Sequence, residues 1–324
     1  MQKKLLLVGE PMELFIAQQE APLEDVRQFS SSIAGAEFNV AVGLTRLGHT
    51  VDYMTKLGND PFGRRIVKTM EQNGIETSLI TYSSNHPTGF MLKGRNPHGD
   101  PEVFYYRRHS AASTLCVSDF EKLDLRGYGY LHITGILPAL SPSCLKAAEF
   151  LMRRAREAGL TVFFDPNLRP QLWKNTAVMV RELNRLATLA DYVLPGCKEG
   201  GILCQSEEPE RICDFYRKLG VKNVIVKIGA NGAYAAAQSG SFYSPAYPAR
   251  NIVDTVGAGD GFAAGVISAV MEKLPLEEAV RRGNAIGTIQ VMNESDNEGL
   301  PTRNELERFM KSSRQNRTEE GKNK

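Results

Sequence analysis

The sequence predicts an α/β fold in which a mainly parallel β-sheet lies between helices and carries a small β-sheet lid. Three observations support this fold class. Short apolar or β-branched runs alternate with segments of helical periodicity along most of the chain. Two segments, residues 10–32 and 86–113, interrupt that alternation. The length of 324 residues, 42% of them hydrophobic, is enough to bury a large core.

The elements follow one another in the order that a parallel sheet requires. Residues 4–8 are predicted to form the first buried strand, and a helix over 36–47, ended by Gly48, leads to a strand over 51–55. The later elements are a helix over 62–73, strands over 130–134, 161–165, 192–194 and 224–228, and helices over 143–158, 261–271 and 276–291. Alternation of this kind places helices on both faces of the sheet.

The two interrupting segments are predicted to form the lid. Both mix alternating, aromatic and charged residues with Pro and Gly, and they show little helical periodicity. We expect a small antiparallel sheet over the carboxyl ends of the parallel strands, where ligands bind in α/β folds. The lid and the main sheet form one domain over residues 1–312. The polar and charged tail over 313–324 is predicted to be disordered.

Composition and charge exclude several classes of protein. The chain has 39 Lys and Arg against 37 Asp and Glu, a net charge of +2, which is unlike a protein that binds nucleic acid or a membrane surface. No apolar run is long enough to span a bilayer, and the first ten residues do not resemble a signal peptide. Five cysteines without a C-x-x-C pair favour reduced thiols. We therefore expect a cytoplasmic protein without a nucleic-acid or membrane partner.

The most informative segment is Asp-Thr-Val-Gly-Ala-Gly-Asp-Gly-Phe-Ala-Ala-Gly over residues 254–265. A turn of Gly257, Ala258 and Gly259 before a helix directs backbone N–H groups toward one point, which creates an anion site. Asp260 beside it supplies the base that phosphoryl transfer to an alcohol needs. The plain alternative is a glycine-rich turn that caps a helix. A dinucleotide fingerprint fails because Phe262 occupies the third glycine position.

This segment resembles the C-terminal signature of the ribokinase-like (PfkB) family of sugar kinases. The segment over 34–48, Ala-Gly-Ala-Glu-Phe-Asn-Val-Ala-Val-Gly-Leu-Thr-Arg-Leu-Gly, resembles the family's N-terminal sugar-binding signature, and the resemblance runs from Lys4 to Met310. It implies a ribokinase-like fold and an ATP-dependent sugar kinase with Asp260 as general base. By the same resemblance, residues 257–259 stabilise charge on the transferred group.

Within the family, the chain is similar to kinases of 2-keto-3-deoxygluconate. Three pieces carry that similarity: Gly-Glu-Pro-Met over 9–12, Tyr-Tyr-Arg-Arg-His-Ser-Ala over 105–111 and Asp-Pro-Asn-Leu-Arg over 165–169. Strand alternation places Tyr105 and Arg107 on one face, and Arg169 follows a buried strand. Guanidinium groups beside an aromatic wall suit a sugar acid. The alternative is that these residues are solvated charges on an edge strand and a surface arginine.

The similarity implies a set of substrate contacts, which are Gly35, Ala36, Glu37, Phe38, Asn39, Met91, Tyr105, Arg107, Arg169, Asp260 and Asp296. Asn39 offers a donor and an acceptor to sugar hydroxyls. Met91 stands where such kinases often carry a tyrosine, so a hydroxyl hydrogen bond is lost there. For Asp296 the alternative is an ordinary loop acid.

The resemblance assigns ATP to Lys227, Gly229, Asn231, Gly232, Gly257 and Gly259, with Asn167 and Arg169 nearby. Residues 226–232, Val-Lys-Ile-Gly-Ala-Asn-Gly, form a buried strand that ends in a glycine turn where backbone can approach phosphates, although a simple hairpin turn also explains them. Glu199 retains the acid of the family's Asn-x-x-Glu and is predicted to orient a hydrated Mg²⁺. Asp254 is a candidate ligand of a monovalent cation such as K⁺.

The sequence thus predicts transfer of the γ-phosphoryl group of ATP to the 6-hydroxyl of 2-keto-3-deoxygluconate, with Asp260 accepting the hydroxyl proton. The nearest alternative is a kinase of a neutral sugar such as fructose or ribose. A non-catalytic sugar-acid sensor and a dehydrogenase are the others, although no phosphate fingerprint follows the first strand at Gly9. An exposed lid face predicts a homo-oligomer, a dimer or larger. The galactonate epimer stays open as an acceptor.

Overall fold

The computed structural model describes residues 3–95, 102–293 and 296–320, with side chains as far as Ser313. Its larger sheet has nine strands: β1 (Lys4–Val8), β4 (Val51–Gly58), β5 (Ile80–Ser83), β8 (Tyr128–Thr134), β9 (Thr161–Asp165), β10 (Tyr192–Val193), β11 (Asn223–Lys227), β12 (Ala233–Ala237) and β13 (Gly240–Ser244). Their spatial order is β13-β12-β11-β10-β9-β8-β1-β4-β5. All neighbouring pairs from β11 to β5 are parallel, and the edge hairpin of β12 and β13 is antiparallel. The mainly parallel sheet is therefore confirmed.

Strand β1 shows how the sheet divides two hydrophobic cores. Leu5 and Leu7 point into one core, and Leu6 and Val8 point into the other; all four side chains are fully buried. A strand buried on both faces reads as a continuous apolar run, which is why Leu-Leu-Leu-Val needs no polar residue.

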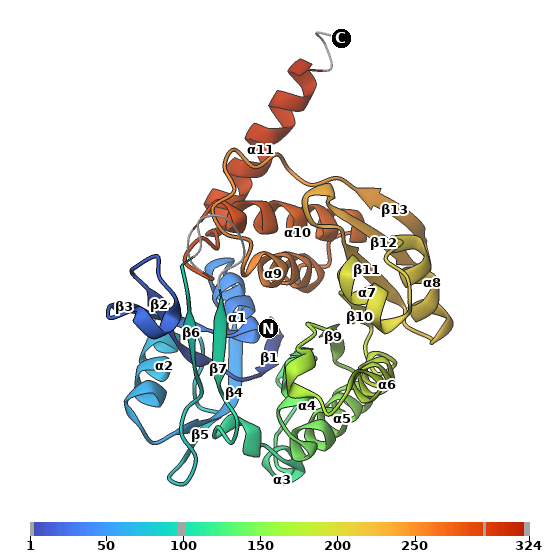
Figure 1. The fold of residues 1–324 in the computed structure, drawn as a ribbon. Helices are drawn as coiled ribbons and strands as arrows, with labels where there is room; N and C mark the ends of the chain where they lie inside the picture. The colour runs from blue at the N-terminus through green and yellow to red at the C-terminus, as the bar shows by residue number, and fades with distance from the viewer. Residues whose placement is uncertain (1–2, 96–101, 294–295, 321–324) are drawn as a thin grey trace.

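Helices cover both faces of this sheet (Figure 1). The first core packs under α1 (Ala36–Arg46), α2 (Pro61–Gln72), α9 (Ala258–Met271), α10 (Leu276–Val291) and α11 (Arg303–Glu320). The second packs under α3 (Val117–Glu121), α4 (Ile136–Leu140), α5 (Pro142–Glu157), α6 (Thr176–Ala187), α7 (Cys197–Leu203) and α8 (Pro209–Lys218). Short 3₁₀ turns lie at Leu23–Asp25, Ala112–Thr114, Pro170–Leu172 and Gly229–Asn231. Across the described part of the chain, no helix combines the length and apolar character that crossing a bilayer requires.

Helices away from the cavity and helices beside it differ in how their first turn is capped. Helix α2 starts at Asp60, whose carboxylate accepts the Gly63 N–H at 2.8 Å, with Pro61 in the first position. Gly35 and Gly257 are the N-cap residues of helices α1 and α9, and no side chain caps the first turn of either helix. Their first N–H groups are therefore left for other acceptors.

The lid is a separate four-stranded sheet, in the order β3-β2-β6-β7. Its strands are β2 (Met12–Ala17), β3 (Phe29–Ala34), β6 (Phe90–Lys93) and β7 (Val103–Tyr106), which stand to one side of the main sheet in Figure 1. The prediction of a wholly antiparallel lid is wrong, because β2 and β6 are parallel. The chain leaves the lid after β3, forms α1, β4, α2 and β5, and returns in the direction of β2. Part of the predicted lid, residues 96–101, lies outside the described residues.

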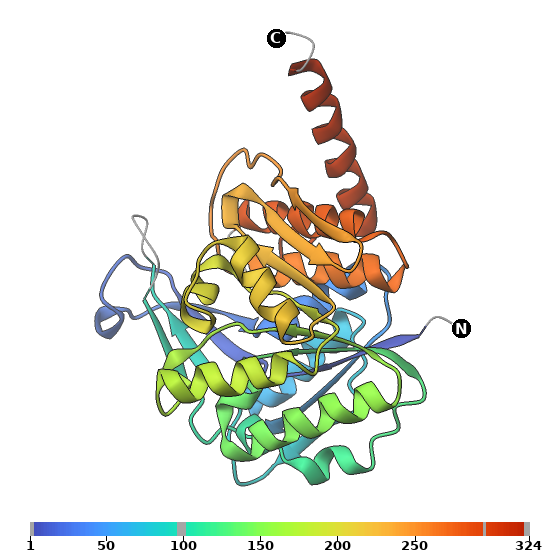
Figure 2. The ribbon, with the colours of Figure 1, turned by 90° about the vertical axis from the view of Figure 1, so that its right-hand side faces the viewer.

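The tail over 313–324 was predicted to be disordered, which stays a prediction, and helix α11 extends to Glu320. Figures 1 and 2 show this helix projecting from the body of the molecule. Arg, Gln and Glu are good helix formers, and the first turns are anchored because Leu306, Phe309 and Met310 pack against the first core. Residues 321–324 lie outside the described part of the chain.

Candidate active site

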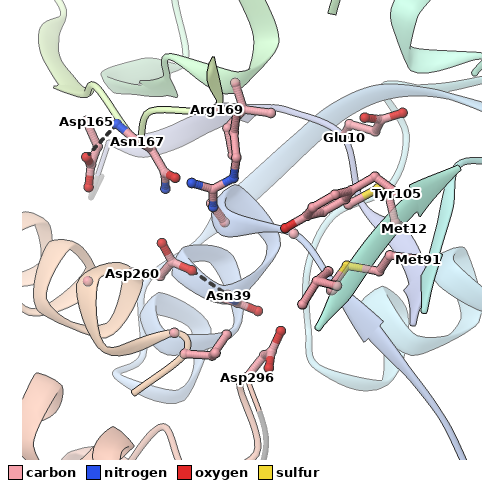
Figure 3. Close-up of a pocket in the computed structure, with 18 of the residues that line it drawn as sticks. Glu10, Met12, Asn39, Met91, Tyr105, Asp165, Asn167, Arg169, Asp260 and Asp296 are labelled. Carbon is pink, nitrogen blue, oxygen red and sulfur yellow. Dashed lines mark hydrogen bonds between the residues drawn. The ribbon is translucent and has the colours of Figure 1, made fainter. Parts of the chain in front are cut away.

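A cavity of about 410 Å³ lies between the lid and the carboxyl ends of β9 and β11. Most of the predicted site residues line it: Gly35, Ala36, Asn39, Met91, Tyr105, Arg107, Asn167, Arg169, Glu199, Lys227, Gly257, Gly259, Asp260 and Asp296. The remaining lining residues were not predicted as contacts: Glu10, Met12, Ala34, Lys93, Val103, Ile136, Asp165, Thr255 and Val256. Residues from both signatures and from the lid therefore meet in one place, as Figure 3 shows for ten of them.

Two of the predicted substrate contacts in the N-terminal signature do not line the cavity. Glu37 is fully buried, and its Oε1 accepts a hydrogen bond of 2.5 Å from the Thr134 hydroxyl. Burial raises the pKa of the Glu37 carboxyl. Phe38 is 1% exposed and packs in the first core. The predicted substrate contacts of Glu37 and Phe38 are corrected accordingly, because on α1 these side chains face the interior.

The predicted anion site lies at the start of α9, which begins at Ala258, three residues before the predicted start at 261. Gly257 has a φ of 77°, and a Cβ there would lie 2.3 Å from the carbonyl oxygen of Asp296. Only glycine fits this position. The N–H groups of the first turn have no acceptor within the helix, and the positive end of the helix dipole adds to their field. Ala258 itself is not among the cavity's lining residues, although its backbone belongs to this turn.

Asp260 lies in that first turn and is held by α1. Its Oδ2 accepts a hydrogen bond of 2.8 Å from the side-chain amide of Asn39 (Figure 3). Burial raises the pKa of Asp260 to about 7, and the Asp165 carboxylate acts in the same direction. The hydrogen bond from Asn39 and the charges of Lys227 and Arg169 act to lower it. A carboxylate with a pKa near neutrality is suited to accept a proton from a hydroxyl and release it later.

Both polar groups of the Asn39 side chain are engaged within the protein. Its Nδ2 donates to Asp260, and its Oδ1 accepts from the Asn297 amide at 3.1 Å. These two contacts orient the side chain beside Asp260 in the cavity wall, and a contact between Asn39 and a sugar hydroxyl stays a prediction.

The loop after β9 is fixed from two directions. Lys227 reaches across from β11 and pairs with Asp165 at 2.6 Å. Glu199 accepts the Leu168 N–H at 2.9 Å through one oxygen and the Gly196 N–H at 2.7 Å through the other. Glu199 thus joins the start of α7 to the loop that carries Asn167 and Arg169. Burial raises the pKa of the Glu199 carboxyl.

Four cationic side chains line the cavity, and Arg169 differs from the other three. Lys227 is paired with Asp165, Arg107 with Glu10 at 2.5 Å, and Lys93 with Asp254 at 2.7 Å. No carboxylate among the described residues lies within ion-pair distance of Arg169, whose Nη1 donates to its own neighbour's carbonyl, Leu168 O, at 2.9 Å. Figure 3 shows its guanidinium pointing into the central space shared with Asp260 and the Tyr105 hydroxyl.

The pairing of Arg107 changes how that residue is interpreted. Its Nε and Nη2 both donate to Glu10 Oε2, at 2.6 and 2.5 Å, and the Ser110 hydroxyl donates to the other oxygen of Glu10. The charge of Arg107 is already balanced by Glu10 within the chain, and its predicted contact with a sugar acid stays a prediction. The predicted placement is confirmed: Tyr105 and Arg107 share one face, with the guanidinium carbon 5.6 Å from the ring centre.

The lid supplies an apolar wall to the cavity. Met91 and Tyr105 are direct partners across β6 and β7, and Met91 is 6% exposed. Met91 packs with Met12, Leu14 and Ala34 in a small cluster on the lid. The thioether contributes packing and no hydroxyl donor, as its residue type predicts.

Comparisons with known proteins agree with this geometry. A sequence model described as "pfkB family carbohydrate kinase" matches residues 2–303. The chain belongs to this family. It is a carbohydrate kinase with a ribokinase-like fold.

Individual relatives of this carbohydrate kinase are similar over almost their whole length. The 2-dehydro-3-deoxygluconokinase of Bacillus subtilis (strain 168) is 44% identical over 307 residues, which cover 94% of this chain and 95% of the relative. The crystal structure of a PfkB protein from Polaromonas sp. JS666 matches with a TM-score of 0.87 at 44% identity, covering 94% of this chain and 99% of that one. An E. coli protein named as a candidate ribokinase II, in complex with ATP and Mg²⁺, matches with a TM-score of 0.87 at 25% identity, covering 96% and 99%.

Three predicted nucleotide residues of this carbohydrate kinase lie outside the cavity. Gly229 and Asn231 form a 3₁₀ turn between β11 and β12, and Gly232 follows with a φ of 105°. A Cβ on Gly232 would lie 2.2 Å from Ser244 O, and the Ile228 N–H donates to Gly232 O at 2.8 Å. The turn thus connects an antiparallel pair, as the hairpin alternative held, and its assignment to ATP stays a prediction.

The two predicted metal residues are both engaged by the protein. Both oxygens of Glu199 accept backbone N–H groups, and Asp254 is paired with Lys93. Among the described residues, no group of three or more His, Cys, Asp or Glu side chains is arranged to hold a metal ion. This suits Mg²⁺ that arrives with phosphates and keeps its waters, and it does not suit a cage built by the protein.

Proposed function

We propose that this carbohydrate kinase transfers the γ-phosphoryl group of ATP to the 6-hydroxyl of 2-keto-3-deoxygluconate, also called 2-dehydro-3-deoxygluconate. One observation carries the proposal: the carboxylate of Asp260 faces the same cavity as the guanidinium of Arg169, which pairs with no carboxylate of the described residues (Figure 3). The first is a base for a hydroxyl, and the second is a receptor for a carboxylate. The 44% identity to a 2-dehydro-3-deoxygluconokinase supports the choice of acceptor.

The reaction follows from the position of Asp260 at the helix terminus. Asp260 accepts the proton of the 6-hydroxyl as the oxygen forms its bond to the γ-phosphorus. The bond between that phosphorus and the oxygen bridging to the β-phosphate breaks, and ADP leaves with the electron pair. The first-turn amides of α9 stabilise the charge on the transferred group, where a helix N-terminus favours anions.

The acceptor is held between the lid and the loop after β9. Arg169 pairs with its carboxylate, Tyr105 and Met91 pack against its carbon chain, and the Nη1 group of Arg107 remains to donate to the keto oxygen. Closure of the lid over the cavity excludes water that would otherwise hydrolyse ATP.

The nucleotide is assigned to the β11–β12 turn, Asn167, Lys227 and the start of α9. Mg²⁺ neutralises charge on the phosphates when bound, and Glu199 and Asp165 are the carboxylates that would orient its waters. A structural relative holds both ATP and Mg²⁺.

We place the protein in the cytoplasm, where ATP is abundant. Phe104 and Tyr106, 49% and 53% exposed on β7, leave the outer lid face available for pairing between subunits.

The test is ADP release with Mg²⁺ and ATP against a panel of acceptors: 2-keto-3-deoxygluconate, its galactonate epimer, 2-ketogluconate, gluconate, fructose and ribose. We expect the first to give the highest kcat/KM. Asp260→Asn should abolish nearly all turnover and retain nucleotide binding, while the exposed control Asp214→Asn should match the wild type. Turnover retained by Asp260→Asn would refute the base assignment.

A neutral-sugar kinase is the second candidate. The structure adds one observation in its favour that the sequence did not reveal. Because Glu10 already balances Arg107, only Arg169 argues for an acid. Preference for fructose or ribose in the panel would establish this alternative, and an absence of turnover with every acceptor would favour the sugar-acid sensor.

A further inference from the structure

Lys93 joins the lid to the segments that form the anion site. It is the last residue of β6 and is 6% exposed. Its ammonium lies 2.7 Å from Asp254 Oδ2 and 3.3 Å from Asp296 Oδ1. The two acids are 161 and 203 residues away in the sequence, so this cluster is a tertiary feature that no local pattern reveals.

Both partners of Lys93 shape the backbone at Gly257. Asp254 Oδ1 accepts the Val256 N–H at 2.9 Å, which bends the segment that enters α9. The carbonyl of Asp296 packs against Gly257 so closely that a Cβ would meet it at 2.3 Å. A displacement of either acid would therefore move the first-turn amides of α9.

The two carboxylates need a cation between them. Asp296 is buried, and its pKa is raised by burial and further by the charge of Asp254, while Lys93 acts to lower it. Although burial alone would lower the pKa of Lys93, Asp296 and Asp254 hold it above its ordinary value. Without the ammonium, the carboxylates of Asp254 and Asp296 would stand together with no cation between them beside the start of α9.

A monovalent cation at Asp254, which the sequence suggested, does not fit this arrangement. The Asp254 oxygens are engaged by the Lys93 ammonium and by a backbone N–H. An ammonium is a compact point charge with three donors, similar in charge to the ion it would replace.

We propose that Lys93 is a positioning residue that supplies the cation required by Asp254 and Asp296, so that the kinase works without a bound monovalent cation. Because the lid carries Lys93, the lid contributes a positive charge to the segments that form the start of α9. The kinase readout of this inference rests on the proposed function, whereas its nucleotide-binding readout depends on ATP recognition alone.

The test compares the wild type, Lys93→Met and Lys56→Met in KCl and in tetramethylammonium chloride at equal ionic strength. Lys56 is a matched control, since it forms a partly buried pair with Asp119 at 3.0 Å away from the cavity. Two quantities are measured. The first is the initial rate with the preferred acceptor, and the second is the affinity for a non-hydrolysable ATP analogue in the presence of Mg²⁺, by calorimetry.

We expect the wild type and Lys56→Met to give the same rate and affinity in both salts. Lys93→Met should lose about tenfold or more in both readouts in tetramethylammonium and regain part of the loss in KCl. Added methylammonium should restore part of the rate and affinity lost by Lys93→Ala. Lys93→Arg retains the charge and is measured in its place if Lys93→Met does not fold.

Two results would overturn the inference: a wild type that requires K⁺ for activity or for nucleotide binding, or a Lys93→Met variant equal to the wild type in tetramethylammonium. If the wild type phosphorylates none of the acceptors but binds the ATP analogue equally in both salts, the proposed function fails and the inference about Lys93 stands.

Discussion

The side chains of Asn39 and Asp260 are joined by a hydrogen bond of 2.8 Å across 221 residues of sequence. It connects the start of α1 to the start of α9, and so it brings the two family signatures into contact. The Asn297 amide donates to the other end of Asn39 at 3.1 Å, which determines which atom of the amide faces the acid. The orientation of the proposed base is therefore controlled from outside its own helix.

Asn39→Ala should lower kcat and make Asp260 more basic. The lost hydrogen bond stabilises the charged carboxylate, and a bond to a charged group is worth about 1.5–3 kcal/mol, or roughly a tenfold to hundredfold effect on rate. The acidic limb of the kcat–pH profile should move to higher pH, because Asn39 acts to lower the pKa of Asp260. Asn85→Ala, on the exposed surface, is the control. An unshifted limb would show that Asn39 does not tune this acid.

The wild-type rate should depend on pH through Asp260. A general base works in its deprotonated form, and burial raises the pKa of Asp260 to about 7. We expect kcat/KM for the acceptor to fall tenfold per pH unit below about pH 7 and to level off above it. The measurement is the pH–rate profile at saturating Mg²⁺ and ATP. A profile flat from pH 5 to 8 would contradict the assignment.

Asp260 should also cost stability at neutral pH. A folded-state pKa raised to about 7 means that the folded protein holds this proton more tightly than the unfolded chain. The contribution of Asp260 to stability is therefore full below the ordinary pKa of an aspartate and is lost as the pH rises through 7. Asp260→Asn removes this dependence. The Tm of the variant minus the Tm of the wild type should therefore be larger at pH 8 than at pH 5. Thermal unfolding of both proteins at the two pH values measures the difference, and an equal gap would contradict the expectation.

The Arg107–Glu10 pair should act mainly on stability. Both side chains are almost fully buried, at 4% and 1% exposure. Arg107→Met leaves Glu10 without its cation, which should cost about 3–5 kcal/mol in the free energy of unfolding by urea. The double variant Glu10→Gln with Arg107→Gln should recover part of that loss. Arg126→Met, which breaks the exposed pair with Asp124, should leave stability unchanged. Equal stability of Arg107→Met and Arg126→Met would show that burial does not strengthen the pair's effect.

The features that the sequence predicted are those with a local signal. Strands β1 and β9 and helix α10 occur at their predicted bounds, because each shows its apolar periodicity over its own length. The start of α9 was predicted three residues late, since Ala258 and Gly259 are weak evidence for a helix in a segment rich in glycine. Helices α6–α8 and the β12–β13 hairpin were not predicted. Their patterns are short, and their stability comes from packing against the sheet.

The missing parts of the site are contacts between distant residues. Glu10 pairs with Arg107 across 97 residues, and Lys93 pairs with Asp254 across 161. The local sequence around these residues is ordinary, since Glu10 is an acid shortly after a strand and Lys93 is a lysine at the end of one. A sequence pattern states which residues are charged and not which charges meet, so Arg107 was predicted as a sugar-acid contact without its partner Glu10, and Lys93 was not singled out.

Gly257→Ala should impair nucleotide binding through a steric clash in addition to backbone strain. Gly257 has a φ of 77°, and an added Cβ would meet Asp296 O at 2.3 Å. Relief of that clash requires the start of α9 to move, which misplaces the amides that receive phosphate. The Kd for an ATP analogue should rise about tenfold or more.

Gly159→Ala separates the two effects. Gly159 has a φ of 74°, nearly the same strain, but nothing lies within 4 Å of the added Cβ. Both variants should lose about 1–2 kcal/mol of stability from the left-handed backbone, and only Gly257→Ala should weaken analogue binding in calorimetry. If both variants bind the analogue as the wild type does, the start of α9 does not form the phosphate site.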